Sequence, residues 1–324
     1  MFGPLRASPA GPVSSILFAA GRGTRLRPLT DLVAKPALPL LDVPLGLWGL
    51  RGLEVAPPSL INLSHRADTV LHTLGLDSRE DMDVLIELPE PFGTGGTLRA
   101  LRDRLDDRVL TWNADTLTDL SARDLMRAHE HTASLATIAV QRVERLADFV
   151  VENGRVTRFV DRRVEDSPGV RFIGVAVFER AALDLLPDRR PSGLSEDLLR
   201  PLAGSGDLAC YIHHGYALDV GTIGRYLQAS RDLLEGRAPA APGPAPGEIV
   251  NVDGGRAYIG PNASVEAESL GPGAVVLEGA LIAKGAVVRD AVIWPGELVP
   301  TGALVENAVW FDGDIIDPGA VRVP

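Results

Sequence analysis

The sequence is poor in cysteine and has no long apolar run. Cys210 is the single cysteine among 324 residues, so no internal disulfide can form. Its neighbours from Leu208 to Ile212 have the pattern of a strand, which predicts a buried structural thiol rather than a nucleophile. No apolar segment approaches the roughly 20 residues of a membrane helix, and residues 1–12 lack the charged-then-apolar pattern of a signal peptide. We therefore predict a cytoplasmic protein with no membrane partner.

An excess of positive charge is also absent. The chain has 32 Lys and Arg against 43 Asp and Glu, which gives a formal net charge of −11. Broad binding to nucleic acid needs clustered Lys and Arg, so we expect no nucleic-acid partner. A local pocket for one small anion is compatible with this charge. An acidic enzyme that handles nucleotides normally recruits Mg²⁺ to offset the like charges.

Strands and helices alternate through residue 235. The composition, 45% apolar and 23% charged, is that of a globular protein, and the length suits about two domains. The first apolar run ends in the glycine turn Gly21-Arg22-Gly23, as in the first βα unit of a doubly wound sheet. The alternation predicts an α/β domain over residues 1–235 with a Rossmann-like, doubly wound, mostly parallel sheet. The expected strands are 59–63, 84–88, 108–112, 136–142, 170–178 and a hairpin over 150–160; the expected helices are 67–76, 97–105, 121–131, 194–202 and 223–234.

The composition changes sharply after residue 235. Residues 236–248 are rich in Pro, Ala and Gly, which predicts a semi-rigid linker. From 249 to 324, aliphatic residues recur about every six positions with small residues between them. This pattern predicts a small left-handed parallel β-helix of hexapeptide repeats, with a β-sandwich as the alternative. A homo-oligomer could form through this tail. The repeating aliphatic positions are Ile259, Val265, Leu270, Val276, Ile282, Val288, Ile293 and Val299.

The first glycine turn carries the strongest chemical signal. Leu17–Thr30 runs from a strand into Gly21-Arg22-Gly23-Thr24, where backbone N–H groups can approach a phosphate closely. Arg25 adds a bidentate charge and Lys35 a point charge. The segment is neither a Walker A loop nor the dinucleotide pattern, because no Gly-Lys-Ser/Thr and no third glycine follow. A Gly-x-Gly turn alone is a weak signal, and by itself a plain tight turn is the better account.

The whole string, however, resembles the opening motif of the sugar nucleotidyltransferase family. That motif is Ala-Gly-x-Gly-Thr-Arg-Leu-x-Pro-Leu-Thr followed by Lys-Pro, and the chain matches it through Lys35-Pro36. The resemblance implies a loop that wraps the triphosphate of an NTP. It implies catalytic roles for Arg25, which steadies the phosphates, and for Lys35, which stabilises charge at the reacting phosphorus. The nucleotide-binding residues that it implies in this loop are Ala20, Gly21, Gly23 and Thr24.

A second glycine loop appears in the family's order. Pro91–Leu98 resembles the family segment that holds the nucleobase and ribose before a helix. The resemblance implies that Gly93, Gly95 and Gly96 bind the nucleotide. A simple strand-to-helix turn is the alternative.

Two carboxylates also stand in family positions. The stretch Asn113-Ala114-Asp115 resembles the family's Asn-Gly-Asp, and Asp219 begins a match to its Asp-Ile/Val-Gly-Thr. The resemblance implies that Asn113 binds the nucleotide and that Asp115 and Asp219 bind Mg²⁺, which prefers carboxylates together with substrate phosphates. Taken alone, each aspartate is more often a helix cap or a turn residue.

The sugar-phosphate site departs most from the family pattern. Resemblances of Phe172–Phe178 and Leu194–Leu199 to family segments imply that Gly174 and Glu196 lie near the sugar. Where the family has Glu-Lys-Pro, this chain has Asp161-Arg162-Arg163, so Arg162 is expected to hold the sugar phosphate bidentately. Two further departures are Ala114 in place of Gly and Tyr216 in place of a common Trp. These changes leave the sugar open and leave room for reduced activity.

We therefore predict transfer of a nucleotidyl group from an NTP to a sugar-1-phosphate, giving an NDP-sugar and pyrophosphate. Among members of the family, the tail resembles that of the mannose-1-phosphate guanylyltransferase-like branch or the ADP-glucose-type branch, whereas Phe172–Phe178 looks closer to short uridylyltransferases that act on N-acetylmuramate-1-phosphate. The resemblance implies GTP with mannose-1-phosphate first, with uridylyl or adenylyl transfer to N-acetylmuramate-1-phosphate or glucose-1-phosphate as alternatives.

A non-catalytic regulatory subunit that binds sugar nucleotides is another alternative, motivated by the substituted Asp161-Arg162-Arg163. The retained charges at Arg25, Lys35, Asp115 and Asp219 argue against it. A β-helix with acyltransferase activity usually uses a histidine as the base. All six histidines of this chain precede the linker, so acyltransferase chemistry in the tail is disfavoured.

Overall fold

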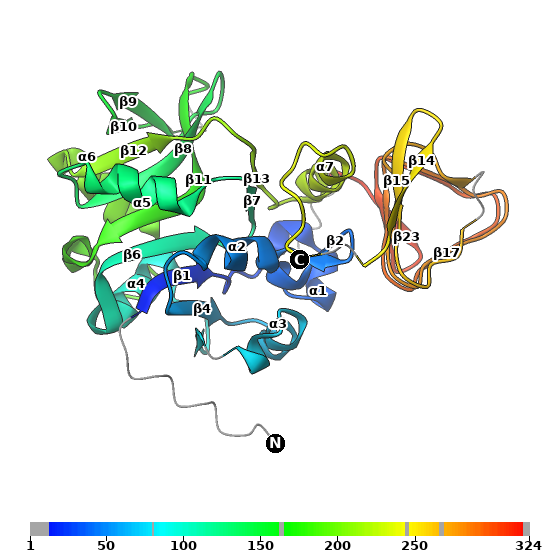
Figure 1. Cartoon of the computed structure of the whole chain (residues 1–324), viewed down its shortest axis with the longest axis horizontal. Coiled ribbons are helices and arrows are strands. Elements are labelled where there is room, and N and C mark those ends of the chain that lie inside the picture. The colour runs from blue at the N-terminus through cyan, green and yellow to red at the C-terminus, as the bar shows by residue number, and fades with distance from the viewer. Residues whose placement is uncertain (1–12, 80, 162–164, 244–245, 266–268, 320–324) are drawn as a thin grey trace. The chain divides into compact units, whose positions relative to one another are not determined.

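The computed structural model describes residues 13–79, 81–161, 165–243, 246–265 and 269–319 (Figure 1). Contacts divide the chain into two compact units. The sheet unit comprises the described residues of Met1–Gly21, Gly49–Thr116 and Leu120–Gly215. The coil unit comprises those of Arg22–Trp48, Leu117–Asp119 and Tyr216–Pro324. The three-part division expected from composition follows other bounds and stays a prediction.

The sheet unit is built on one nine-stranded sheet, in the order β5-β4-β1-β6-β11-β8-β12-β10-β9. Neighbours from β5 to β6 are parallel, as are β8 and β12, but β11 runs antiparallel to both β6 and β8. The expectation of a mostly parallel sheet is therefore wrong, and the sheet is mixed. A parallel return needs a crossover connection, usually helical, whereas the described residues between β8 and β11 form the hairpin of β9 and β10. The strands are β1 (Val13–Phe18), β4 (Ser59–Leu63), β5 (Met82–Ile86), β6 (Leu105–Asn113), β8 (Ala136–Val143), β9 (Phe149–Glu152), β10 (Arg155–Phe159), β11 (Gly169–Glu179) and β12 (Leu208–Ile212).

Helices of the sheet unit fall close to the expected ranges. Ser121 caps α5 as its side chain accepts a hydrogen bond from Asp124 N at 3.2 Å, which stabilises the helix start. The helix expected over 97–105 begins earlier, so the second glycine loop forms its first turn. The helices are α2 (Gly46–Leu53, which begins in the coil unit), α3 (Ala67–Thr73), α4 (Thr94–Leu101), α5 (Ala122–Glu130) and α6 (Arg200–Ser205), the last preceded by a π-helical turn over Ser195–Leu199.

The order of strands reverses at β1. The chain passes from β1 to β4 and β5 on one side and then places β6 on the other side of β1. Ligands of open α/β sheets bind beyond the carboxyl ends of strands at such a switch point. The carboxyl ends of β1 and β6 carry Ala19–Gly21 and Ala114–Asp115, so the sheet places both expected segments at one edge.

The tail of the coil unit is a stack of short parallel strands from β15 to β22, with the antiparallel pairs β14–β15 and β22–β23 at its ends. Paired positions of these strands lie 17 residues apart: Val275 with Val292 and Val309, Leu281 with Leu298, and Val287 with Leu304. Successive strands enter three different sheets in turn, as a winding coil requires. The predicted hexapeptide positions from Val276 to Val299 are buried. The strands are β14 (Glu248–Val252), β15 (Gly255–Ile259), β16 (Val275–Val276), β17 (Leu281–Ile282), β18 (Val287–Arg289), β19 (Val292–Ile293), β20 (Leu298–Val299), β21 (Leu304–Glu306), β22 (Val309–Phe311) and β23 (Asp314–Ile316).

One hydrophobic core joins the tail to the residues that follow the first glycine turn. The core brings together side chains of the 22–48 segment, of helix α7 and of the coil. Trp48 extends it toward the linker, since its Nε1 donates a hydrogen bond to the carbonyl of Pro239 at 3.2 Å. Figure 1 shows β2 and α7 beside the coil. The remaining elements are α1 (Leu29–Leu32), β2 (Pro39–Leu40), β3 (Val43–Pro44), β7 (Thr116–Thr118), β13 (Ala217–Asp219) and α7 (Ile223–Leu234), with 3-10 turns at Thr24–Leu26 and Lys35–Ala37.

Within the described ranges, no helix has the length and apolar character needed to cross a membrane.

Candidate active site

The first glycine turn leaves β1 in a defined conformation. Ala19 and Ala20 are buried, and the Ala19 amide donates to Asn62 Oδ1 at 2.8 Å. Gly21 is exposed. Gly23 has a φ of 63°, and a Cβ there would lie 2.9 Å from Thr30 Cγ2 and 3.2 Å from Lys35 Cβ. Glycine is therefore required at position 23 both by conformation and by space.

Three charged residues that the sequence singled out meet in the coil unit. Lys35 Nζ lies 3.9 Å from Asp219 Oδ1, and the Lys35 side chain is only 12% exposed against 51% for Asp219. A Cβ on Gly221 would lie 2.8 Å from both Arg25 Nη2 and Asp219 Oδ1. The glycine thus leaves space for a guanidinium and a carboxylate beside the same backbone. Arg25 is exposed.

The Asp-Val-Gly-Thr segment has a structural explanation as well. Asp219 is the last residue of β13, and Thr222 is the N-cap of α7, its side chain accepting from Arg225 N at 3.3 Å. The segment therefore places Asp219 just before the start of a helix. The Arg25, Lys35, Asp219 and Gly221 residues together are called the charged cluster below.

Gly221 offers a direct test of the charged cluster. We expect Gly221→Ala to lower kcat about 10- to 100-fold, because the added methyl displaces Arg25 or Asp219 by a few tenths of an ångström or more. The melting temperature should change by no more than about 2 °C, because both displaced groups are ends of flexible side chains. Gly204→Ala is the matched control, since a Cβ there meets nothing within 4 Å. A Gly221→Ala enzyme with wild-type kcat in a pyrophosphate-release assay would contradict this account.

The sheet unit brings together Asn113, Asp115 and Gly174. Asn113 ends β6 and half-buried Asp115 follows in the turn. Gly174 has a φ of 81° at an irregularity in the pairing of β11 with β8, and a Cβ there would lie 2.8 Å from Asn113 Nδ2. Thr116 Oγ1 donates to Ile173 O at 3.1 Å, which fixes this approach. Gly174 is therefore needed for the close contact of β11 with the Asn113 segment.

The Ala114 departure is accommodated. Its side chain is buried, and its amide donates to Phe18 O at 3.0 Å, which ties the turn to the end of β1.

The second glycine loop packs against another chain segment. The amides of Gly95 and Gly96 donate to the carbonyl of Ser192 at 3.0 and 3.2 Å, and a side chain on Gly93 would collide with that carbonyl. The three glycines thus allow two backbones to touch. Their predicted contact with a nucleotide stays a prediction. Arg190 stacks over the Phe92 ring at 4.1 Å beside this loop.

Three buried polar residues that the sequence analysis did not identify hold this loop. The Glu87 carboxyl group, fully buried, accepts from Phe92 N at 2.7 Å, from Asn62 Nδ2 at 2.9 Å and from Thr97 Oγ1 at 2.5 Å. Since Asn62 Oδ1 also accepts from Ala19 N, the network joins the second glycine loop to the segment that leads into the first glycine turn. The available signal was an asparagine inside an apolar strand and a glutamate directly after the next strand.

The expected sugar-phosphate residues are scattered. Glu196 is exposed and pairs with Arg200 one helical turn later, at 2.9 Å. The neighbouring Asp197, rather than Glu196, fixes the loop by accepting from Ser192 Oγ at 2.7 Å. Arg162 lies outside the described residues. The roles expected for Glu196 and Arg162 stay predictions.

The chemistry of the two predicted metal ligands fits Mg²⁺. Asp115 is half-buried and Asp219 half-exposed, and both offer the hard carboxylate oxygens that Mg²⁺ prefers. Asp115 belongs to the sheet unit and Asp219 to the coil unit. Among the described residues, no group of three or more His, Cys, Asp or Glu side chains is placed to hold a metal by itself. At either aspartate, a bound Mg²⁺ would need further ligands, such as phosphate oxygens and water.

A model of the nucleotidyl transferase family matches residues 14–236, more than half of the chain. This chain belongs to the nucleotidyl transferase family. A mannose-1-phosphate guanylyltransferase of Mycobacterium tuberculosis is 27% identical over 290 residues, which cover 85% of this chain and 76% of that protein. A UTP–glucose-1-phosphate uridylyltransferase of Synechocystis sp. is 25% identical over 249 residues, which cover 68% of this chain and 63% of that protein. HddC from Yersinia pseudotuberculosis, solved in complex with GMP-PN, shares the fold with a TM-score of 0.57 at 19% identity, covering 68% of this chain and 99% of that one.

These likenesses confirm the prediction of a sugar-1-phosphate nucleotidyltransferase at the level of family and reaction class. The family match contains both glycine loops and the charged cluster. It ends at residue 236, so the coil strands of this nucleotidyl transferase lie beyond it.

Proposed function

We propose that this nucleotidyl transferase moves a guanylyl group from GTP to mannose-1-phosphate. The relative from Mycobacterium tuberculosis, whose likeness extends over 85% of this chain, supports the choice of base and sugar. An oxygen of the sugar phosphate attacks the α-phosphorus of GTP, the bond from that phosphorus to the bridging oxygen breaks, and pyrophosphate leaves. The products are GDP-mannose and pyrophosphate, and no covalent enzyme intermediate is formed.

The single observation that carries the proposal of nucleotidyl transfer is the charged cluster. Positioning and charge neutralisation provide most of the catalysis in transfers at phosphorus. Lys35 is held nearly out of solvent, so its ammonium charge acts where the local dielectric constant is lower than in water. Arg25, which is exposed, offers a fork that matches a pair of phosphate oxygens. We assign Lys35 to the reacting phosphorus and Arg25 to the remaining phosphates.

We further propose that Asp115 and Asp219 bind Mg²⁺, which supplies charge neutralisation for the phosphates when bound. Ala20, Gly21, Gly23 and Thr24, together with Asn113 and the Gly93–Gly96 loop, are assigned to the nucleotide. Gly174, Glu196 and Arg162 are assigned to the sugar phosphate.

Pyrophosphate release from a matrix of substrates tests the proposal. Five nucleotides (ATP, CTP, GTP, UTP and dTTP) are each combined with mannose-1-phosphate, glucose-1-phosphate and N-acetylmuramate-1-phosphate in the presence of Mg²⁺. We expect the highest kcat/KM for GTP with mannose-1-phosphate. A maximum for UTP with a glucose phosphate would favour the activity named for the Synechocystis relative. Binding of a nucleotide sugar without turnover in any combination would identify a non-catalytic subunit instead.

Other parts of the assignment remain proposals. We retain a left-handed winding for the coil, as expected from its hexapeptide spacing. A cytoplasmic location and a homo-oligomer formed through the coil also stay predictions.

A further inference from the structure

A tight hairpin follows Lys35 and carries an aspartate at its tip. Strands β2 and β3 are joined by the two residues Leu41 and Asp42, whose φ values are 50° and 59°. Two successive residues with positive φ form the turn that suits a two-residue hairpin, but residues other than Gly, Asn or Asp seldom adopt this backbone conformation. Leu41 is held by burial in the hydrophobic core of the coil unit. Contacts from outside the hairpin therefore maintain this turn.

The coil holds the Asp42 carboxyl group on both sides. Oδ2 accepts from the Tyr258 hydroxyl and Oδ1 accepts from the Glu278 amide, each at 3.0 Å. Tyr258 is fully buried and its hydroxyl accepts in turn from Gly247 N at 3.0 Å. Burial raises the pKa of the Tyr258 hydroxyl far above its ordinary value, so the hydroxyl stays a donor. At Gly260 a side chain would collide with Asp42 Oδ2, so the coil is shaped around the carboxyl group.

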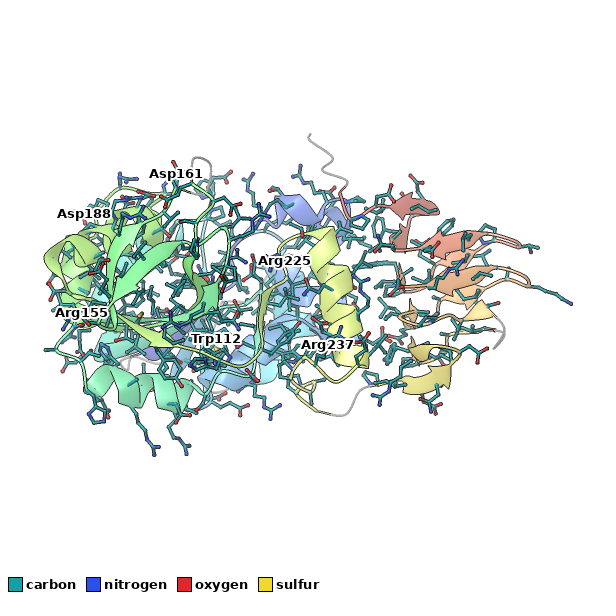
Figure 2. All side chains as sticks on the ribbon, turned by 90° about the horizontal axis from the view of Figure 1, so that it is seen from above. Trp112, Arg155, Asp161, Asp188, Arg225 and Arg237 are labelled. Atoms are coloured by element: carbon teal, nitrogen blue, oxygen red, sulfur yellow. The ribbon has the colours of Figure 1, made fainter. Side chains whose placement is uncertain are left out.

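The same coil holds the segment that carries Asp219. Helix α7, which starts just after Gly221, ends against the coil, where Arg256 Nη1 donates to Leu234 O at 3.2 Å. Arg231 Nη1 on α7 lies 3.5 Å from Asp290 Oδ1 of the coil. Figure 2 shows α7 along the coil, with Arg225 labelled near its start and Arg237 just beyond its end.

We propose that Asp42 is a positioning residue through which the coil sets the place of Lys35 relative to Asp219. The proposal rests on the nucleotidyl transfer proposed above. The Lys35 and Asp219 segments lie far apart in the sequence, and their side chains meet at 3.9 Å. Each segment is anchored to the coil, so the coil is the common reference for that distance. A shift of about 1 Å in a reacting group can cost on the order of 100-fold in rate, so loss of one anchor acts on catalysis.

Asp42→Asn is the test, because the amide keeps the size of the side chain but replaces one acceptor with a donor. We expect kcat with GTP and mannose-1-phosphate to fall about 10- to 100-fold while KM for GTP changes less than about threefold. Hydrogen exchange of amides 35–44 should become faster, whereas exchange over 281–299 should not change. Tyr258→Phe, which removes the donor from the other side, should give the same pattern. Glu306→Gln, which removes only the 3.0 Å pair with Arg289 within the coil, is the matched control and should behave as wild type.

A double-mutant cycle separates positioning from general loss of stability. Adding Asp42→Asn to Lys35→Met should change kcat by less than about threefold, because the coil no longer has Lys35 to position. An equal effect of Asp42→Asn in both backgrounds, or unchanged kcat and unchanged exchange in an active enzyme, would overturn the proposal. If the wild type releases no pyrophosphate with any substrate pair, the proposed function fails. Exchange of amides 35–44 then decides the inference alone: faster exchange in Asp42→Asn supports the anchor, and unchanged exchange refutes it.

Discussion

Replacing Lys35 with methionine is expected to lower kcat for nucleotidyl transfer about 100- to 1000-fold, the usual cost of removing one group that stabilises transition-state charge. Methionine keeps the unbranched shape of the side chain, is one heavy atom shorter, and removes the charge. Because Lys35 is 12% exposed, bulk water does not replace the lost charge effectively. KM for GTP should rise much less than kcat falls, since the charge is placed where negative charge develops rather than on the ground-state nucleotide.

The sequence offers a matched control, because Lys284 is the one other lysine in the chain. Lys284 is exposed on the coil, so Lys284→Met should retain wild-type kcat. Both variants should keep the wild-type melting temperature within about 2 °C, since the pair of Lys35 with half-exposed Asp219 is a weak stabilising contact. A Lys35→Met enzyme that loses affinity for GTP but keeps kcat would assign Lys35 to ground-state binding and refute its role at the reacting phosphorus.

Local sequence signals were sufficient for most of the helices and strands. The glycine turn after β1 and the Asp-Val-Gly-Thr segment before α7 each carry a complete local pattern, whereas the 3.9 Å approach of Lys35 to Asp219 is visible only in the fold. Hydrophobic periodicity likewise predicted the stacked strands of the tail, where the recurring aliphatic positions from Val276 to Val299 are buried. These features depend on residues close together in the sequence.

Long-range pairing was beyond local signals. The direction of β11 depends on which strands receive it, and a strand pattern carries no information about its neighbours. Asp42 has the sequence pattern of an ordinary turn residue, and only the fold shows that the coil binds its carboxyl group. In the same way, periodicity predicted a coil but gave no indication that the coil shares a hydrophobic core with the segment that carries Lys35. Composition alone placed the tail and the charged cluster in separate domains, but in the fold the two share a hydrophobic core.

Glu87→Gln is the second large effect that we expect, and it acts on stability. The Glu87 carboxyl group receives three hydrogen bonds from Phe92 N, Asn62 Nδ2 and Thr97 Oγ1 in a site with no solvent exposure. An amide must turn its NH₂ group toward at least one of these donors, which leaves two donors facing each other without an acceptor. The free energy of unfolding should fall by about 2 to 3 kcal/mol, because a buried donor left without an acceptor costs the desolvation of that donor. The melting temperature followed by differential scanning fluorimetry should fall by about 4 to 12 °C.

The effect should be specific to the buried network. Glu152→Gln, an exposed substitution on the β9–β10 hairpin, should leave the melting temperature unchanged within about 2 °C. Glu87→Leu, which fills the site but offers no acceptor, should be at least as destabilising as Glu87→Gln, because all three donors then lack a partner. Wild-type melting for both Glu87 variants would show that the network does not hold the two glycine loops. Because Asn62 connects Glu87 to Ala19 N, hydrogen exchange in Glu87→Gln should rise in both loops together, at amides 19–21 and 92–97.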